Sequence, residues 1–100
     1  MSELSRTLQA LSDPTRREIL RILGQGDKNA GEIARQFDMT LPSVSHHLSV
    51  LKSANLVQAE RAGQNIIYSL NSTVMQEALQ QLFELFQVRK PDADTPRDPL

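Results

Sequence analysis

The spacing of hydrophobic residues changes along the chain, from a helical period to alternation and back to a helical period. Over most of the sequence, apolar residues recur three or four positions apart, as in an amphipathic helix. Asp13-Pro14 has the form of an N-cap followed by the first helical residue, because Asp accepts from first-turn amides and Pro has no amide to leave unpaired. The expected helices are residues 3–11, a segment from Pro14 to Gly24 or Gly26, and residues 30–37, 41–54 and 73–88.

Two short runs before the last helix follow the alternating pattern instead. Residues 56–61 and 65–70 are separated by Ala62-Gly63-Gln64, a three-residue linker with a central Gly. Such runs around a Gly-containing linker are typical of a β-hairpin. The sequence therefore predicts a mainly α (α+β) fold with about five helices and a two-stranded hairpin.

The third and fourth predicted helices are short and close together. Asn29 is a candidate N-cap with Glu32 three residues later, which is the capping-box arrangement. The link of residues 38–40 is short, and Thr40 is itself a good N-cap for the next helix. Two helices joined in this way form a helix-turn-helix, in which the second helix enters a DNA groove.

The predicted helix 41–54 has two sides of opposite chemistry. At about 100° per residue, one stripe is apolar and suited to burial: Leu41, Val44, Leu48 and Leu51. The far side is polar and carries Pro42, Ser43, His46, Ser49 and Ser53, with Ser45 and His47 on opposite flanks. The helix has no acidic residue, and Lys52 is its only Lys or Arg, whereas a solvated face is usually rich in charges.

Small hydroxyls and imidazoles allow close approach to another macromolecule. The DNA major groove is wide enough for a helix and offers hydrogen-bond donors and acceptors at base edges. The alternative is that Ser and His simply occupy an ordinary exposed helix, with His46 and His47 adjacent by chance. The preceding helix and short link favour the DNA-binding interpretation.

The tip of the predicted hairpin carries polar side chains that can reach DNA. Arg61, Gln64 and Asn65 are placed to contact a phosphate or the minor groove. Arg61 can equally serve only to solvate an exposed strand edge. For Tyr68 we favour a role as a core aromatic.

Three segments together resemble a known family. They are the run from Leu11 to Leu20, the run Ser43-Val44-Ser45-His46-His47-Leu48, and the hairpin from Arg61 to Leu70. In this order and spacing they resemble the ArsR-type winged helix-turn-helix repressors, and most of all the SdpR-like, metal-independent autorepressors. The resemblance covers roughly residues 3–88. It implies a cytoplasmic bacterial homodimer that represses transcription from an operator, with Ser43, Ser45 and His46 at base edges or nearby phosphates and the wing tip on the flanking backbone.

The first and last helices are the expected dimer interface. A single domain of 100 residues buries only about two-thirds of its unfolded surface, so it is marginal alone. The last helix has an apolar band too broad for one small core to cover. We expect both terminal helices to pack against their copies through Leu4, Leu8, Met75, Leu79, Leu82 and Phe86. The alternative is that the last helix folds back onto its own domain.

Charge gives DNA binding only weak support. The net charge is −1 and the pI is near 6.1, whereas DNA-binding domains usually have a basic surface. Arg16, Arg17 and Arg21 either approach the DNA backbone or pair with Glu18 and other acids. Binding should therefore depend on shape and on two half-sites engaged together.

Metal sensing, a cofactor and catalysis are all disfavoured. There is no Cys, and the two adjacent His diverge by about 100° on a helix, so one subunit offers no chelating pair. No catalytic constellation or phosphate-binding loop occurs, and an enzyme is the least favoured class. No signal peptide or long apolar run is present, which favours a cytoplasmic chain without membrane insertion. No pattern specifies an inducer, whether protein or small molecule.

The last residues differ in composition from the rest. Residues 89–100 contain three Pro among alternating charges, which predicts a flexible tail after a DNA-binding and dimerisation domain at residues 1–88. The function expected is a sequence-specific DNA-binding repressor, of its own promoter among others, acting through the helix at 41–54 and the wing at 56–70. The near-neutral charge keeps one alternative open, a winged-helix module that binds a protein instead of DNA.

Overall fold

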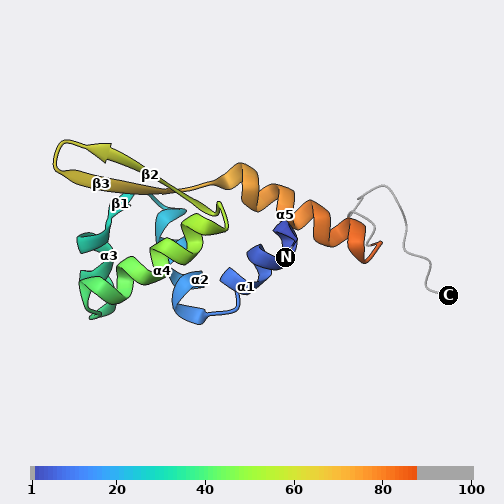
Figure 1. Cartoon of the computed structure of the whole chain (residues 1–100), viewed down its shortest axis with the longest axis horizontal. Helices are drawn as coiled ribbons and strands as arrows, with labels where there is room; N and C mark the ends of the chain where they lie inside the picture. Colours follow the sequence, from blue (N-terminus) through green and yellow to red (C-terminus); the bar gives the residue numbers. More distant parts are fainter. Residues whose placement is uncertain (1, 88–100) are drawn as a thin grey trace.

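The computed structural model describes residues 2–87, which contain five helices and three strands. In chain order these are α1 (Glu3–Ala10), α2 (Pro14–Leu23), β1 (Lys28–Asn29), α3 (Ala30–Phe37), α4 (Leu41–Ser53), β2 (Val57–Ala62), β3 (Asn65–Leu70) and α5 (Ser72–Leu85). Helices α2, α3 and α4 pack together beside the sheet, and α5 extends away from it with α1 alongside (Figure 1). The five predicted helices are confirmed. The predicted flexible tail, residues 89–100, lies outside the described residues.

The helix starts follow from capping side chains. The Asp13 carboxylate accepts from the Arg16 backbone N–H at 3.0 Å, ahead of Pro14 in the first turn of α2. The predicted capping box of α3 is formed, with Asn29 Oδ1 accepting from Glu32 N–H at 2.8 Å and Glu32 Oε1 accepting from Asn29 N–H at 2.9 Å. Thr40 Oγ1 accepts from Ser43 N–H at 3.3 Å. The caps therefore set both ends of the short link between α3 and α4.

The sheet has one strand more than the sequence predicted. Its strands are all antiparallel and lie in the order β1-β3-β2, with Lys28 opposite Tyr68 and Val57 opposite Leu70. The predicted two-stranded hairpin is confirmed as β2 and β3. The sequence did not predict the additional strand β1, because its two residues cannot display an alternating pattern. The strand precedes α3 directly, so its pairing with β3 fixes the start of α3 against the hairpin.

The hairpin turn is tighter than expected. Ala62 pairs with Asn65, so the turn has two residues between the strands rather than three. Gly63 adopts φ 65°, a left-handed conformation that costs Gly little, and a Cβ there would meet nothing within 4 Å. The constraint at this position is therefore the backbone conformation and not space. The tight turn holds the hairpin tip away from the core.

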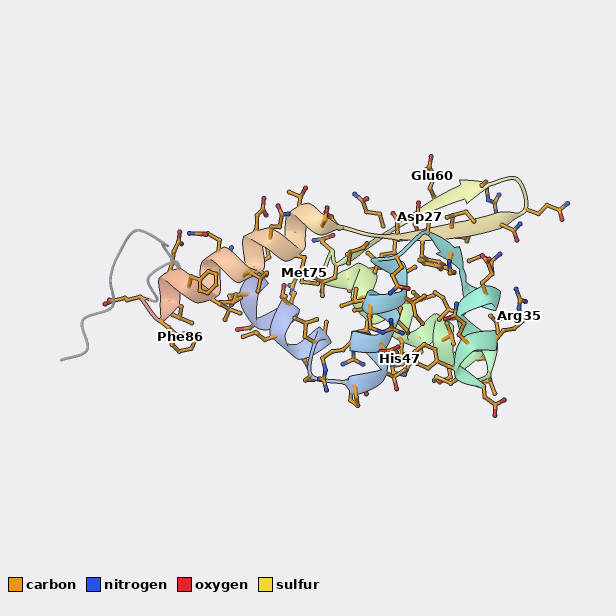
Figure 2. All side chains as sticks on the ribbon, turned by 180° about the vertical axis from the view of Figure 1, so that it is seen from behind. Asp27, Arg35, His47, Glu60, Met75 and Phe86 are labelled. Carbon is orange, nitrogen blue, oxygen red and sulfur yellow. The ribbon has the colours of Figure 1, made fainter. Side chains whose placement is uncertain are left out.

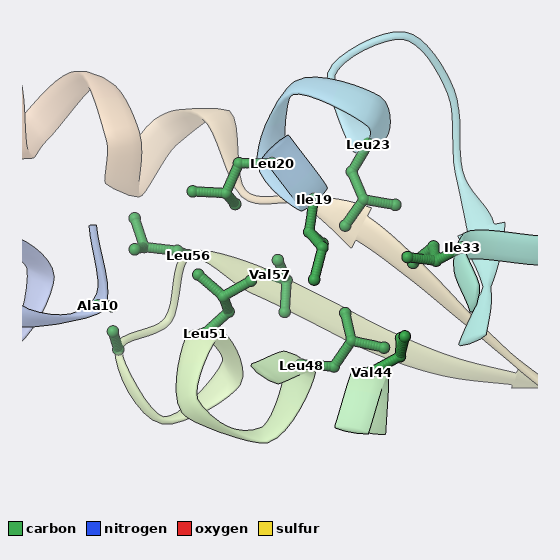
Figure 3. Close-up of a cluster of buried hydrophobic side chains, with 11 residues drawn as sticks. Ala10, Ile19, Leu20, Leu23, Ile33, Val44, Leu48, Leu51, Leu56 and Val57 are labelled. Atoms are coloured by element: carbon green, nitrogen blue, oxygen red, sulfur yellow. The ribbon is translucent and has the colours of Figure 1, made fainter. Parts of the chain in front are cut away.

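The core lies where α2, α3 and α4 meet the base of β2 (Figure 3). The residues with no exposed surface include Ile19, Ile33, Val44, Leu48, Leu51 and Leu56. Leu41 departs from the predicted buried stripe, because 51% of its surface is exposed. Periodicity gives a residue's angle around the helix axis, but it does not say how far along the axis the core extends. The buried stripe of α4 therefore begins one turn later, at Val44.

Candidate nucleic-acid interface

One side of α4 faces away from the core. Val44, Leu48 and Leu51 are buried beneath it. The predicted DNA-binding residues Pro42, Ser45, His46 and Ser49 are all exposed on the outer side. This face presents two hydroxyls and an imidazole, with no carboxylate among them. It can both donate and accept hydrogen bonds, which is the chemistry that base edges require.

His47, also predicted to bind DNA, lies on a different side of α4. Its side chain is only 15% exposed, and its Nδ1 lies 4.0 Å from Asp13 Oδ2. The Nη1 atom of Arg16 is 3.5 Å from the same ring nitrogen. Figure 2 shows the His47 ring on the side of α4 next to α2. The two imidazoles, whose ring centres lie 5.8 Å apart, thus have different environments, with His46 exposed and His47 packed between helices. Ser43 is half-buried.

Asp13 has an environment that favours its charged form. The backbone N–H of Arg16 donates to the carboxylate and holds the pKa of Asp13 below its ordinary value. The nearby His47 and the Arg16 guanidinium lower this pKa further, while partial desolvation opposes them. An ionised Asp13 therefore links the start of α2 to the buried flank of α4.

The arginines of α2 are engaged within the chain. Arg16 donates from Nε to the Ala10 carbonyl at 2.7 Å and from Nη2 to the Gln9 carbonyl at 3.1 Å. Arg17 donates to the Leu11 carbonyl at 2.7 Å, and Arg21 forms an ion pair with Glu18. Of the two interpretations left open by the sequence, these contacts favour intramolecular pairing over DNA backbone contact.

The hairpin tip and the first turns of α4 border one groove. Arg61, Gln64 and Asn65, the three predicted wing residues, are all exposed. A groove of about 490 Å³ separates β3 from the starts of α3 and α4. Its polar lining includes Asn29, Arg35, Ser45, Gln64 and Asn65. The fold therefore brings Gln64 and Asn65 of the wing and the start of the predicted recognition helix to one groove, whereas Arg61 lies outside its lining.

Several groove residues were not assigned to this surface from the sequence, and Arg35 and Leu41 are two of them. Arg35 is an exposed base on α3, and Leu41 was placed in the core. The sequence did contain a signal for Arg35, because it is a basic residue outside the apolar face of α3 and close to the turn that leads into α4. Nothing in the pattern of apolar residues distinguished Leu41 from Val44.

The terminal helices expose much of their apolar surface. Leu8, Leu79 and Phe86 are 43%, 49% and 69% exposed, and Phe86 lies at the end of the molecule opposite the hairpin tip (Figure 2). The other predicted interface residues, Leu4, Met75 and Leu82, are half-buried. Only the first turns of α5 pack on the core, through Val74 and Met75, with Ala78 also buried. The last helix thus folds back onto its own domain only in its first turns, which leaves the rest of its apolar surface uncovered in the single chain.

The part of the chain that the structure describes, residues 2–87, lacks two kinds of feature. No three His, Cys, Asp or Glu side chains lie close enough together to hold a metal ion within that range. None of the helices described there has the length and apolar character needed to cross a membrane.

The comparisons with known proteins agree with this geometry. A model of the bacterial regulatory proteins of the arsR family matches residues 13–59. The transcriptional repressor SdpR of Bacillus subtilis is 44% identical over 91 residues, which cover 91% of this chain and 99% of that protein. An ArsR-like transcriptional regulator from Rhodococcus sp. RHA1 superposes with a TM-score of 0.79 at 29% identity, over 85% of this chain and 80% of that one.

A second similar solved structure is a homodimer. It is the homodimeric winged helix-turn-helix DNA-binding domain from Mycobacterium bovis, with a TM-score of 0.71 at 28% identity over 93% of this chain and 88% of that one. The helix-turn-helix of α3 and α4, the wing of β2 and β3, and the extent of the match to SdpR agree on one assignment. The chain belongs to the ArsR family of bacterial regulatory proteins.

Proposed function

We propose that this protein is a homodimeric transcriptional repressor that binds a palindromic DNA operator in the cytoplasm. The single observation that carries the proposal is the outer face of α4, where Ser45, His46 and Ser49 are exposed and Ser45 lines a groove shared with the wing. The similarity to SdpR along nearly its whole length supports repression as the activity. Promoter binding by such a protein blocks transcription without any chemistry, so no cofactor is needed.

In this proposal α4 is the recognition helix. Its N-terminal turns enter the major groove, where Ser45 and His46 hydrogen-bond to base edges and Pro42 approaches them closely. Ser43 and Ser49 contact bases or nearby phosphates. The wing residues Arg61, Gln64 and Asn65 lie on the flanking backbone or in the minor groove. His47 contributes mainly by holding α4 against α2, since only 15% of its side chain is exposed.

The dimer is proposed to form through α1 and α5. The exposed apolar residues on these helices would promote nonspecific association of a single chain. They are covered when two copies pack around a two-fold axis. The homodimeric neighbour from Mycobacterium bovis supports this arrangement. Residues 1–88 are then the whole DNA-binding and dimerisation unit. Two recognition helices together read half-sites about 34 Å apart.

Dimerisation also compensates for the low charge. With a net charge of −1, one subunit gains little from DNA phosphates. Linking two half-sites turns the second contact into an intramolecular event, which raises the overall affinity without new contacts. Specific binding should then depend less steeply on salt than that of a strongly basic repressor.

The test is a gel shift with the DNA upstream of the protein's own gene, repeated between 50 and 300 mM salt, roughly the range in which counterion release is measurable. A scrambled duplex of the same length and composition is the control. Tight binding of the natural duplex alone supports an autorepressor. Tight binding of other promoters but not this one supports a repressor of other genes. Failure to bind any duplex specifically would favour the alternative, a winged-helix module that binds proteins.

A further inference from the structure

Leu41 is a large hydrophobic side chain that the fold leaves half uncovered at the start of α4. Its exposed fraction is 51%, whereas Val44 and Leu48 on the same helix have none. Burial of apolar surface is the main stabilising contribution of a Leu side chain, so an exposed Leu adds little to the stability of one chain. A single exposed Leu is common on proteins and carries no inference by itself. The position of this one is what distinguishes it.

Leu41 is the first residue of α4, directly after its N-cap Thr40. In helix-turn-helix complexes the N-terminal residues of the recognition helix are the ones that reach base edges. Ser45 lies four residues later and thus on the same side of the helix, one turn farther along. Both residues line the groove between α4 and β3. Leu41 therefore occupies the part of α4 that enters deepest into a major groove.

The surroundings of Leu41 mix polar and apolar side chains. Gln64, Asn65 and Arg35 line the same groove, and Ile66 on β3 is its other exposed large aliphatic residue, at 44%. A protein partner that bound by apolar contact would need a contiguous patch, which this mixed lining does not offer. A base edge in the major groove does suit it, because it combines hydrogen-bonding atoms with an occasional methyl group.

Building on the DNA binding proposed above, we propose that Leu41 determines sequence specificity by packing against the 5-methyl group of a thymine in each half-site. The thymine methyl is the apolar group on the major-groove edge of a base pair, and it distinguishes T from C at that position. Ser45, one turn away, hydrogen-bonds to a neighbouring base. The start of α4 then reads two adjacent positions by different means, one apolar and one polar.

The experiment removes the methyl group from the DNA and its partner from the protein. A duplex is first selected from a random-sequence pool with the wild-type protein, and each thymine is then replaced in turn by deoxyuridine, which lacks only the 5-methyl group. Each half-site should contain one thymine at which a single replacement weakens wild-type binding about fourfold, the effect of losing one buried methyl. Replacing both symmetry-related thymines should weaken it about 15-fold.

Two protein variants and one control complete the design. Leu41→Ala should bind the thymine and deoxyuridine duplexes equally, and Leu41→Gln, which keeps a side chain of similar length, should do the same. Ser53→Ala shortens an exposed side chain at the far end of α4, away from the dimer contact, and should retain the full dependence on the methyl group. Circular dichroism and thermal melting of each variant verify that the fold is kept.

The outcomes separate this inference from the proposed function. If the wild-type protein selects and binds a duplex but no thymine methyl matters, or if Leu41→Ala and Leu41→Gln keep the same dependence as wild type, the role of Leu41 is wrong and DNA binding stands. If no duplex is enriched from the pool, the proposed function itself fails, and the role of Leu41 fails with it.

Discussion

Nδ1 of His47 lies 4.0 Å from Oδ2 of Asp13, so a residue of the predicted recognition helix contacts the N-cap of α2. The same carboxylate oxygen accepts from the Arg16 backbone N–H. Asp13 therefore has two roles, because it caps one helix and positions another. A substitution there should affect both the stability of α2 and the placement of α4.

The first prediction concerns pH. Because contacts in the folded protein lower the pKa of Asp13, its ionised form adds stability above the ordinary Asp pKa of about 4, and this contribution is lost as the pH falls through the lower folded-state pKa. Asp13→Ser keeps an N-cap oxygen but removes the charge. The variant should lose less stability than wild type between pH 6 and about pH 3. Urea unfolding at several pH values measures this, and parallel losses in both proteins would contradict it.

The second prediction concerns the outer face of α4. Ser45→Ala and His46→Ala should each weaken operator binding by about 1–3 kcal/mol, the usual cost of losing a base contact, while the melting temperature stays near that of wild type. Ser53→Ala is the matched control, because Ser53 is exposed on the same helix but lies eight residues beyond Ser45, about 12 Å along the axis. Fluorescence anisotropy with a labelled operator gives the affinities. Unchanged affinity in both test variants would remove the recognition-helix assignment.

The third prediction links the terminal helices to DNA binding at a distance. Leu82→Glu or Phe86→Glu would bury an unpaired carboxylate in the proposed dimer contact and cost several kcal/mol of association, about 3–5 by analogy with broken buried ion pairs. Operator binding should fall with the dimer, although neither residue lies near α4. Gln80→Glu adds the same charge to the polar side of α5 and should leave the dimer intact.

Analytical ultracentrifugation and a gel shift on the same samples check the third prediction. A folded monomeric variant that still bound a full palindromic site with wild-type affinity would show that dimerisation is not required. Loss of binding with the dimer intact would instead point to a change in α4.

The fourth prediction concerns metal ions. With no Cys in the chain and no group of three potential ligands in residues 2–87, one equivalent of Zn²⁺ should not bind tightly. Operator affinity should change by no more than a few-fold when Zn²⁺ is added or chelated, about 1 kcal/mol at most. Calorimetric titration tests the first statement and anisotropy the second. A tight site would mean that ligands come from both subunits.

Much of the fold could be predicted because its signals are local. Asp13, Asn29 and Thr40 mark helix starts through hydrogen bonds within one turn, and these contacts occur as expected. The strand β1 could not be predicted, because its two residues are ordered only by pairing with β3, about 40 positions later in the chain.

The candidate site was predictable only in part for a related reason. The angular position of a residue on α4 follows from the sequence, which is why Ser45, His46 and Ser49 are found together on the outer face. Which part of the fold packs against each side of α4 does not follow from the sequence. The contact of His47 with Asp13 depends on how α2 crosses α4, and the exposure of Leu41 depends on where the core ends.

Arg16, on α2, contacts two other helices with a single side chain. Its guanidinium donates to the carbonyls of Gln9 and Ala10 at the end of α1 and lies beside His47 on α4. If α1 belongs to the dimer contact, the orientation of each recognition helix relative to the two-fold axis is transmitted through this one group. The distance between the two recognition helices, and with it the half-site spacing that the dimer accepts, is then fixed by the connection between α1 and α2. How much variation in spacing is accepted depends on how rigidly Arg16 holds that connection.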